Sequence, residues 1–225
     1  MALFKTIKNM IGARKGEPVI EKFGPLQARL DGQVLVDNTT FLVNNQFLAV
    51  ENPGDVHQLT HVGTTNVANI PFTRYYLEGV TDDSETILQV AGVEKADEII
   101  MFRKVDEIHP QTAEQWEEMR EVLAQDVFEF QEVGYGNVWN ALLAHSEKVV
   151  AAPSLKEDEY TYPCETALFK RQISEDNEPE LSEYALVAIE DEERVVAEVA
   201  TEVGRLLVRH VAEREDLDAG GDHRH

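Results

Sequence analysis

The feature that most constrains the fold is a series of short alternating apolar stretches between residues 26 and 108, separated by turn-forming residues. Alternation with a period of two is typical of β-strands that bury one face. The Asp31-Gly32 pair predicts one hairpin, and the turn at residues 52–55 predicts a second. We therefore expect a meander, a small barrel or a sandwich. The stretches are "LQARLDGQVLVD", "FLVNNQFLAVENPGDVHQLTHVG", "FTRYYLEGV", "ETILQVAGV" and "EIIMFRKVDEI".

A helix is predicted directly after these strands. Thr112 and Gln115 have the spacing of a capping box, in which each residue bonds the backbone N–H of the other. Trp116, Met119 and Leu123 then recur with the period of a helix and form its apolar stripe. We expect this central helix to stand in the chain between a β-rich half that ends near residue 108 and a second β-rich part.

Strands are expected again beyond residue 126, in "VFEFQEV", "ALFKRQI" and "EYALVAI", and "VGYGNVW" is expected to hold a turn. The segment "ERVVAEVATEVGRLLVRH" fits a helix or a strand. The expected class is α+β, β-rich, with a central helix and a short N-terminal amphipathic helix. The expected division is residues 1–17, a globular region over 18–212 (one body, or sub-domains 18–125 and 126–212), and a disordered acidic and histidine-containing tail over 213–225.

Residues 3–11 predict that N-terminal helix, because their apolar residues fall on one side at a period of 3.6. The first sixteen residues carry four basic side chains and no acidic one, whereas the whole chain has a net charge of −23. Such a helix suits docking on an anionic membrane or on a protein partner, and the alternative is that it packs on the protein's own core. The candidate docking residues are Leu3, Phe4, Lys5, Ile7, Lys8, Met10 and Ile11.

The charge and the cysteine content bear on partners and compartment. A strongly acidic chain repels phosphates, so we expect no nucleic-acid partner, although an acidic DNA-mimic inhibitor is a further alternative. No apolar run reaches the length of a membrane span. Cys164 is the single cysteine, which suits a reducing compartment, and acidic neighbours should raise the pKa of its thiol. We expect a cytoplasmic protein that can lie against the inner membrane.

Candidate chemistry in the sequence is sparse. His57 and His61 are four residues apart, but on a strand this spacing separates them and a third ligand is needed, so they are weak candidates for a metal site. The glycines of "VGYGNVW" lack the spacing of a phosphate-binding loop. We therefore expect no catalytic residue and no cofactor.

The order of these segments resembles the YjfK-like family of bacterial proteins of unknown function. The resemblance spans most of residues 20–210, and its most specific part runs from Phe102 to Trp116. It implies a β-rich fold that ends in a β-type segment, which favours a strand at residues 195–203. It also implies a role in envelope maintenance beside phage-shock-type membrane proteins, and it supplies no catalytic residues. The segments that carry it are "QARLDGQVLVD", "FLAVENPGDVHQLTHVG", "TRYYLEG", "ILQVAG", "EIIMFRKVDEIHPQTAEQWEEM" and "VGYGNVW".

The leading hypothesis is thus a non-enzymatic cytoplasmic accessory protein that binds a protein partner and docks through its N-terminal helix. The alternative is an enzyme or a small-ligand-binding protein whose site is assembled from dispersed residues. A pocket with convergent polar groups would favour that alternative.

Overall fold

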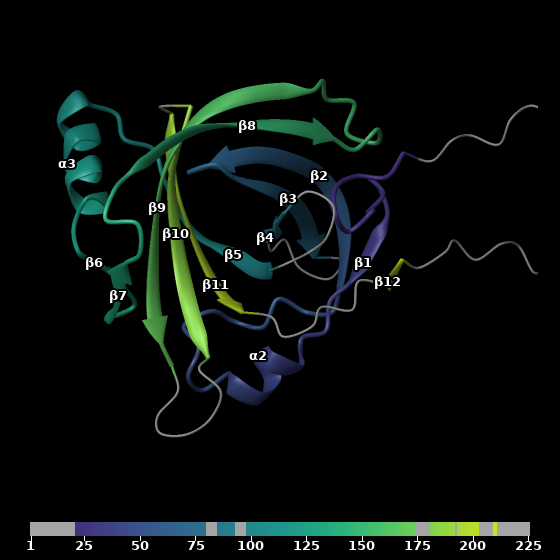
Figure 1. Cartoon of the computed structure of the whole chain (residues 1–225), viewed down its shortest axis with the longest axis horizontal. Helices are drawn as coiled ribbons and strands as arrows, with labels where there is room; N and C mark the ends of the chain where they lie inside the picture. Colours follow the sequence, from purple (N-terminus) through teal and green to yellow (C-terminus); the bar gives the residue numbers. More distant parts are fainter. Residues whose placement is uncertain are drawn as a thin grey trace, which may run out of the picture.

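A closed barrel of antiparallel strands dominates the structure (Figure 1). The computed structural model describes residues 21–79, 85–92, 98–173, 181–191, 193–202 and 209–210. Within these residues eight strands form the barrel, and the last in order, β8, pairs with the first, β2. In pairing order they are β2 (Val56–Val67), β3 (Ile70–Gly79), β4 (Glu85–Ala91), β5 (Glu98–Ile108), β11 (Arg194–Glu202), β10 (Ser182–Glu190), β9 (Tyr160–Gln172) and β8 (Leu143–Ala151).

Shorter elements lie outside this ring. The strands β1 (Gln33–Leu35) and β12 (Arg209–His210) extend the sheet beyond β2. On the opposite side of Figure 1, helix α3 (Ala113–Leu123) lies beside the hairpin of β6 and β7, and β7 pairs with β9. The remaining elements are β6 (Val127–Phe130), β7 (Val133–Asn137) and α2 (Thr39–Asn44).

The expected α+β class with a central helix is wrong. The described chain is mostly strand, its two helices are short, and both lie outside the barrel. The strands pair with one another around a closed ring, so the fold needs no helix to cover an open sheet. Helix α3 itself was predicted correctly: Gln115 N donates to Thr112 Oγ1 at 3.2 Å, and Thr112 N donates to Gln115 Oε1 at 3.2 Å.

Most of the expected strands are confirmed, including β3, β4, β5, β10 and the ambiguous segment that forms β11. Both expected hairpins are wrong. Asp31 has a φ of 61° and Gly32 N donates to Arg29 O at 3.0 Å, so a turn does form there, but β1 after it pairs with β2 and β12. Helix α2 replaces the strand expected before residue 52, and β7 occupies part of the "VGYGNVW" turn. Strand β8 was not predicted.

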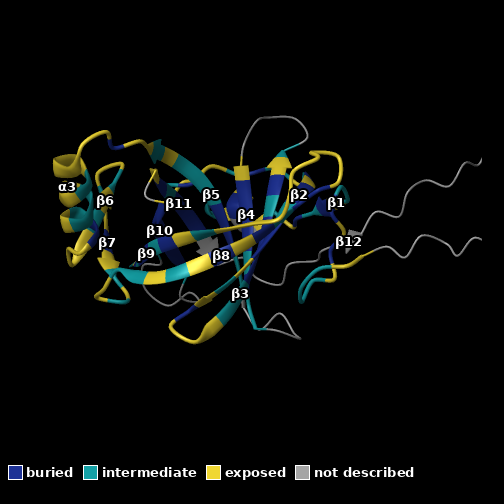
Figure 2. Cartoon of the chain, turned by 90° about the horizontal axis from the view of Figure 1, so that it is seen from above, coloured by how far each residue is buried: buried dark blue, intermediate teal, exposed yellow. Residues whose placement is uncertain are grey.

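The barrel wall is covered on both faces. Every residue of β10 is buried, as the dark blue of Figure 2 shows. Alternate residues of β10 contribute to two separate apolar clusters, because successive side chains of a strand point to opposite faces. The larger cluster lies on the outer face, where residues 23–50, α3 and the β6–β7 hairpin cover the wall.

Specific contacts attach these outer segments to the barrel wall. The phenol of Tyr75 on β3 accepts from Leu26 N and donates to Phe23 O, both at 3.1 Å, and so holds the segment before β1. On the other side, the rings of Phe128 and Phe169 pack with centroids 5.3 Å apart. The larger apolar cluster of this protein is therefore outside the barrel, and the smaller one is inside it.

Candidate functional site

Charged side chains meet inside the barrel. Arg74 on β3 forms ion pairs with Glu147 on β8 and with Glu198 on β11. Strands β3 and β11 are not neighbours in the ring, so this contact crosses the barrel interior. The exposed fractions of the three side chains are 5%, 1% and 4%. Space is tight here, because a Cβ at Gly63 on β2 would overlap the Glu147 carboxylate.

Two tyrosines complete what we call the inner charge cluster, defined as Arg74, Tyr76, Glu147, Tyr162 and Glu198. Arg74 Nη1 lies 3.4 Å from Glu147 Oε2, and its Nη2 donates to Glu198 Oε2. The Tyr76 hydroxyl donates to Glu147 Oε1 at 2.5 Å and lies 3.5 Å from the Tyr162 hydroxyl. The cluster thus holds two carboxylates against one guanidinium, all out of contact with bulk water.

Burial sets the protonation of this cluster. It raises the pKa of Glu198 to about 7 against the opposing effect of Arg74, and Glu190 and Glu147 raise it further. Burial acts to lower the pKa of Arg74, but Glu198, Tyr76 and Glu147 outweigh it, so the guanidinium stays charged. Near neutral pH the carboxyl group of Glu198 therefore exchanges a proton.

This proton predicts a pH dependence of stability. The pKa of Glu198 is raised on folding from 4.5, so the stability that its protonated form contributes is complete below about pH 4.5 and is lost as the pH rises through about 7. Glu198→Gln keeps a neutral side chain at every pH. From pH 5 to pH 8 the free energy of unfolding of Glu198→Gln should rise relative to wild type by about 2–3 kcal/mol. Urea unfolding at both pH values measures this.

The control for that comparison is Glu129→Gln, which removes an exposed carboxylate on β6. Its difference from wild type should stay constant between the two pH values. A constant difference for Glu198→Gln as well would show that Glu198 does not titrate near neutrality.

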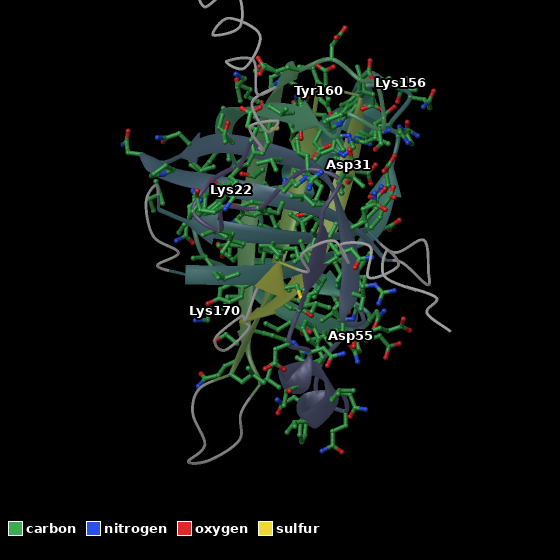
Figure 3. The ribbon with its side chains drawn as sticks, turned by 90° about the vertical axis from the view of Figure 1, so that its right-hand side faces the viewer. Lys22, Asp31, Asp55, Lys156, Tyr160 and Lys170 are labelled. Atoms are coloured by element: carbon green, nitrogen blue, oxygen red, sulfur yellow. The ribbon has the colours of Figure 1, made fainter. Side chains whose placement is uncertain are left out.

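A cavity of about 180 Å³ opens at the barrel end next to the inner charge cluster, and we call it the mouth cavity. Tyr76 and Tyr162 belong to both. Figure 3 shows Tyr160 at the same end of the molecule as Lys156, whereas Lys170, further along β9, lies toward the other end. The lining residues come from seven of the eight barrel strands: Thr60, His61, Tyr76, Leu77, Glu78, Glu85, Thr86, Ile87, Val149, Tyr160, Tyr162, Glu190 and Arg194.

The walls of the mouth cavity change from exposed to buried. Glu78 and Tyr160 are exposed at the rim, whereas Ile87 and Glu190 are buried. Thr86 is fully buried, and its Oγ1 has no hydrogen-bond partner among the described residues. Its side chain lies on the outer face of β4 with Leu88, because Ile87 between them faces inward.

Ion pairs fix the charges around the mouth. Arg194 binds Glu190 through Nε at 2.9 Å and Nη2 at 2.8 Å. Lys104 lies 2.8 Å from Glu85 and 2.6 Å from Glu107. Both rim cations are therefore already paired with carboxylates.

The pKa values of Cys164 and Tyr162 show the combined effect of these charges and of burial. Burial raises the pKa of the Cys164 thiol to about 12, and Glu147 and Glu190 raise it further despite Arg74. The pKa of Tyr162 is raised for the same reasons in the same order. Carboxylates thus outweigh guanidinium groups here, and the expected rise for Cys164 is confirmed, although burial rather than its sequence neighbours is the main cause.

The residues that the sequence suggested as metal or docking sites do not form a common site among the described residues. His57 is fully buried on β2 opposite Val34 of β1, whereas His61 lies at the mouth with Nε2 3.2 Å from Glu157. A bulge in the β2–β3 pairing separates them. Among the described residues, no group of three or more His, Cys, Asp or Glu is arranged to hold a metal. The expected docking residues Leu3, Phe4, Lys5, Ile7, Lys8, Met10 and Ile11 lie outside the described residues.

Sequence reasoning did not single out Arg74, Glu147 or Glu198. Each is a charged residue in a strand, which is the ordinary signature of a solvent-facing position. Only the pairing of β8 with β2 closes the ring and places all three inside.

Comparison with known proteins gives one match. The family model described as "Protein of unknown function (DUF2491)" matches residues 4–207. No curated protein and no solved structure matches the chain. In the part of the chain that the structure describes, no helix has the length and apolar character to cross a membrane. The matched residues include all eight barrel strands and the segments that cover them, and the chain belongs to this family.

Proposed function

We propose that this protein is a non-enzymatic accessory protein that binds a small ligand in the mouth cavity. The observation that carries the proposal is the cavity of about 180 Å³ with convergent polar groups, floored by a buried charge cluster. Cavities of this kind in barrel mouths are common ligand sites. An engineered cavity of about 150 Å³ already holds benzene, so the volume suits a molecule of about six to ten non-hydrogen atoms.

Binding rather than catalysis is favoured by the state of the charged groups. Glu190 and Glu85 are held by Arg194 and Lys104. Ion pairs hold these carboxylates in position, where they can orient a ligand by charge. A general acid or base must reach the substrate and exchange a proton with it. Glu198, which exchanges a proton near neutral pH, is bonded to Arg74 below the cavity and does not line it. Of the functional alternatives drawn from the sequence, the small-ligand-binding protein with a dispersed site is thus the one that this geometry supports.

The biological setting of the proposal rests on the resemblance alone. It comprises membership of the narrower YjfK-like group, a cytoplasmic place at the inner membrane, and an envelope-maintenance role with a phage-shock-type protein partner. The N-terminal docking helix belongs to the same proposal and stays a prediction.

The test is ligand-observed saturation-transfer NMR with a library of small fragments of mixed charge. We expect binders with dissociation constants at or below about 1 mM whose signals are lost in Ile87→Phe, which fills the inner wall. Tyr160→Trp at the exposed rim is a second blocking variant should Ile87→Phe unfold. Val127→Phe, at an exposed position of β6, is the matched control and should bind as wild type does. Fragments that bind equally to all four proteins, or to none, would refute the proposal.

A further inference from the structure

The charge of the mouth cavity narrows the kind of ligand. Its lining contains the three carboxylates Glu78, Glu85 and Glu190 and the single guanidinium of Arg194. Arg194 is committed to Glu190, and below the cavity Arg74 is committed to two carboxylates. Within the lining that the structure describes, an anionic ligand would meet a surplus of negative charge and no unpaired guanidinium or ammonium group. A like charge close to buried carboxylates is strongly unfavourable.

Aromatic rings form much of the remaining wall. Tyr160 and Tyr162 stack on β9 with ring centroids 5.9 Å apart, and Tyr76 faces the cavity from β3. His61 adds its ring edge-on to Tyr76, with centroids 6.2 Å apart. The faces of such rings attract organic cations. The carboxylates of Glu78, Glu85 and Glu190 line the same cavity and attract a cation as well. Arg74, which lies 5.4 Å from the Tyr76 ring centroid, already makes this kind of contact inside the barrel.

The site rests on the cavity and its rings, and the acidic lining adds the preference for charge. The buried hydroxyl of Thr86 takes no part in it. Thr86 lies opposite Leu77 of β3 and Arg103 of β5, on the outer face of β4, whereas the next residue, Ile87, faces inward.

We infer that the mouth cavity binds a small organic cation, namely a free amine or quaternary ammonium compound of about six to ten non-hydrogen atoms. This inference rests on the proposed function and adds the chemical class of the ligand. The ammonium group lies against the rings of Tyr160 and Tyr162, near Glu190. Burial raises the pKa of Tyr76, Tyr160 and Tyr162, so the rings that contact the cation carry neutral hydroxyl groups.

The test uses three probes of one shape that differ in charge: choline, its neutral isostere 3,3-dimethylbutan-1-ol, and 3,3-dimethylbutanoate. Titrations followed by protein NMR give their dissociation constants for the full chain. We expect choline to bind about tenfold more tightly than the neutral isostere, and the anion to bind most weakly. The salt dependence of choline binding should be modest, because the pairing groups are partly buried.

Variants at the exposed rim distinguish the contribution of the aromatic ring to choline binding from that of the carboxylate, without disturbing the core. Tyr160→Leu should weaken choline about fivefold and leave the neutral isostere nearly unchanged, whereas Tyr160→Phe, which keeps the ring, should bind choline as wild type does. Glu78→Gln should weaken choline about threefold, and the distant control Glu129→Gln should not. Choline and its isostere binding equally at the mouth would overturn the inference and leave the proposed function standing. Failure of these probes and of the whole fragment library would overturn both.

Discussion

Arg74→Met should lower the free energy of unfolding by about 3–5 kcal/mol at pH 8, one of the largest effects available in this protein. The substitution removes the only cation in contact with Glu147 and Glu198 among the described residues, and both carboxylates are nearly inaccessible to solvent. An uncompensated buried charge is far less stable than a paired one. The loss should be smaller at pH 5, where the raised pKa of Glu198 lets it take up a proton. Urea unfolding at the two pH values measures both effects.

Two further variants show whether charge or packing is responsible. The triple variant Arg74→Met, Glu147→Gln, Glu198→Gln has no ionisable group left at these positions and should recover to within about 2 kcal/mol of wild type. Lys148→Met is the matched control on the same strand as Glu147. It breaks the exposed pair with Glu159 at 2.9 Å and should change stability by less than about 1 kcal/mol. Equal losses for Arg74→Met and Lys148→Met would contradict a buried cluster.

The strands themselves were largely predictable, because their apolar alternation is a local property of the sequence. Closure of the barrel was not, and β8 shows why. Its sequence "LAHSEKVVA" carries His145 and Glu147 on the inner face and Lys148 on the outer face, so it has no apolar side to recognise. Strand β8 pairs with β9 on one side and closes the ring by pairing with β2 on the other. In the closing pair Gly63 lies opposite Val149, and nothing in either segment alone specifies that pairing.

The candidate site was hidden for the same reason. Arg74, in "TRYYLEG", has the appearance of a surface residue until the ring closes around it. The rings of Tyr160 and Tyr162 could be recognised as a pair on one strand face, since they are two residues apart. Their relation to Tyr76 depends on β3, which lies far from β9 in the sequence. Local patterns therefore predicted most of the strands that carry the site, but neither its residues nor their assembly.

Helix α2 illustrates a tertiary effect that overrides propensity. The residues "TTFLVN" are rich in the β-branched and aromatic types that favour strands, and sequence analysis expected one there. The six-residue helix has no side-chain cap, so its own bonds do little to specify it. What holds this region is the segment after it: Ala49 N and Val50 N donate to Glu183 Oε1 on β10 at 2.9 and 3.3 Å.

Glu183→Ala is accordingly expected to destabilise the protein by about 3–5 kcal/mol. Glu183 is fully buried on the outer face of β10, and besides the two amides it accepts from Tyr135 of β7 at 2.8 Å and from Arg171 of β9 at 2.6 Å. One carboxylate therefore attaches both the α2 segment and the β6–β7 hairpin to the barrel wall. Its removal breaks four hydrogen bonds. Arg171 keeps its bond to Phe47 O, whereas the amides of Ala49 and Val50 have no alternative partner among the described residues.

The location of the damage distinguishes this role from a general loss of packing. Hydrogen exchange of the amides of Ala49 and Val50 should accelerate in Glu183→Ala by more than that of the barrel strands, because the α2 segment opens locally before the barrel unfolds. Glu165→Ala is the matched control, since Glu165 also pairs with an arginine on the outer face, Arg120 at 3.2 Å, but is more than one-third exposed. It should lose less than about 1 kcal/mol and leave exchange near residue 50 unchanged. If exchange in Glu183→Ala accelerates uniformly over the barrel, Glu183 does not act as an anchor for the outer segments.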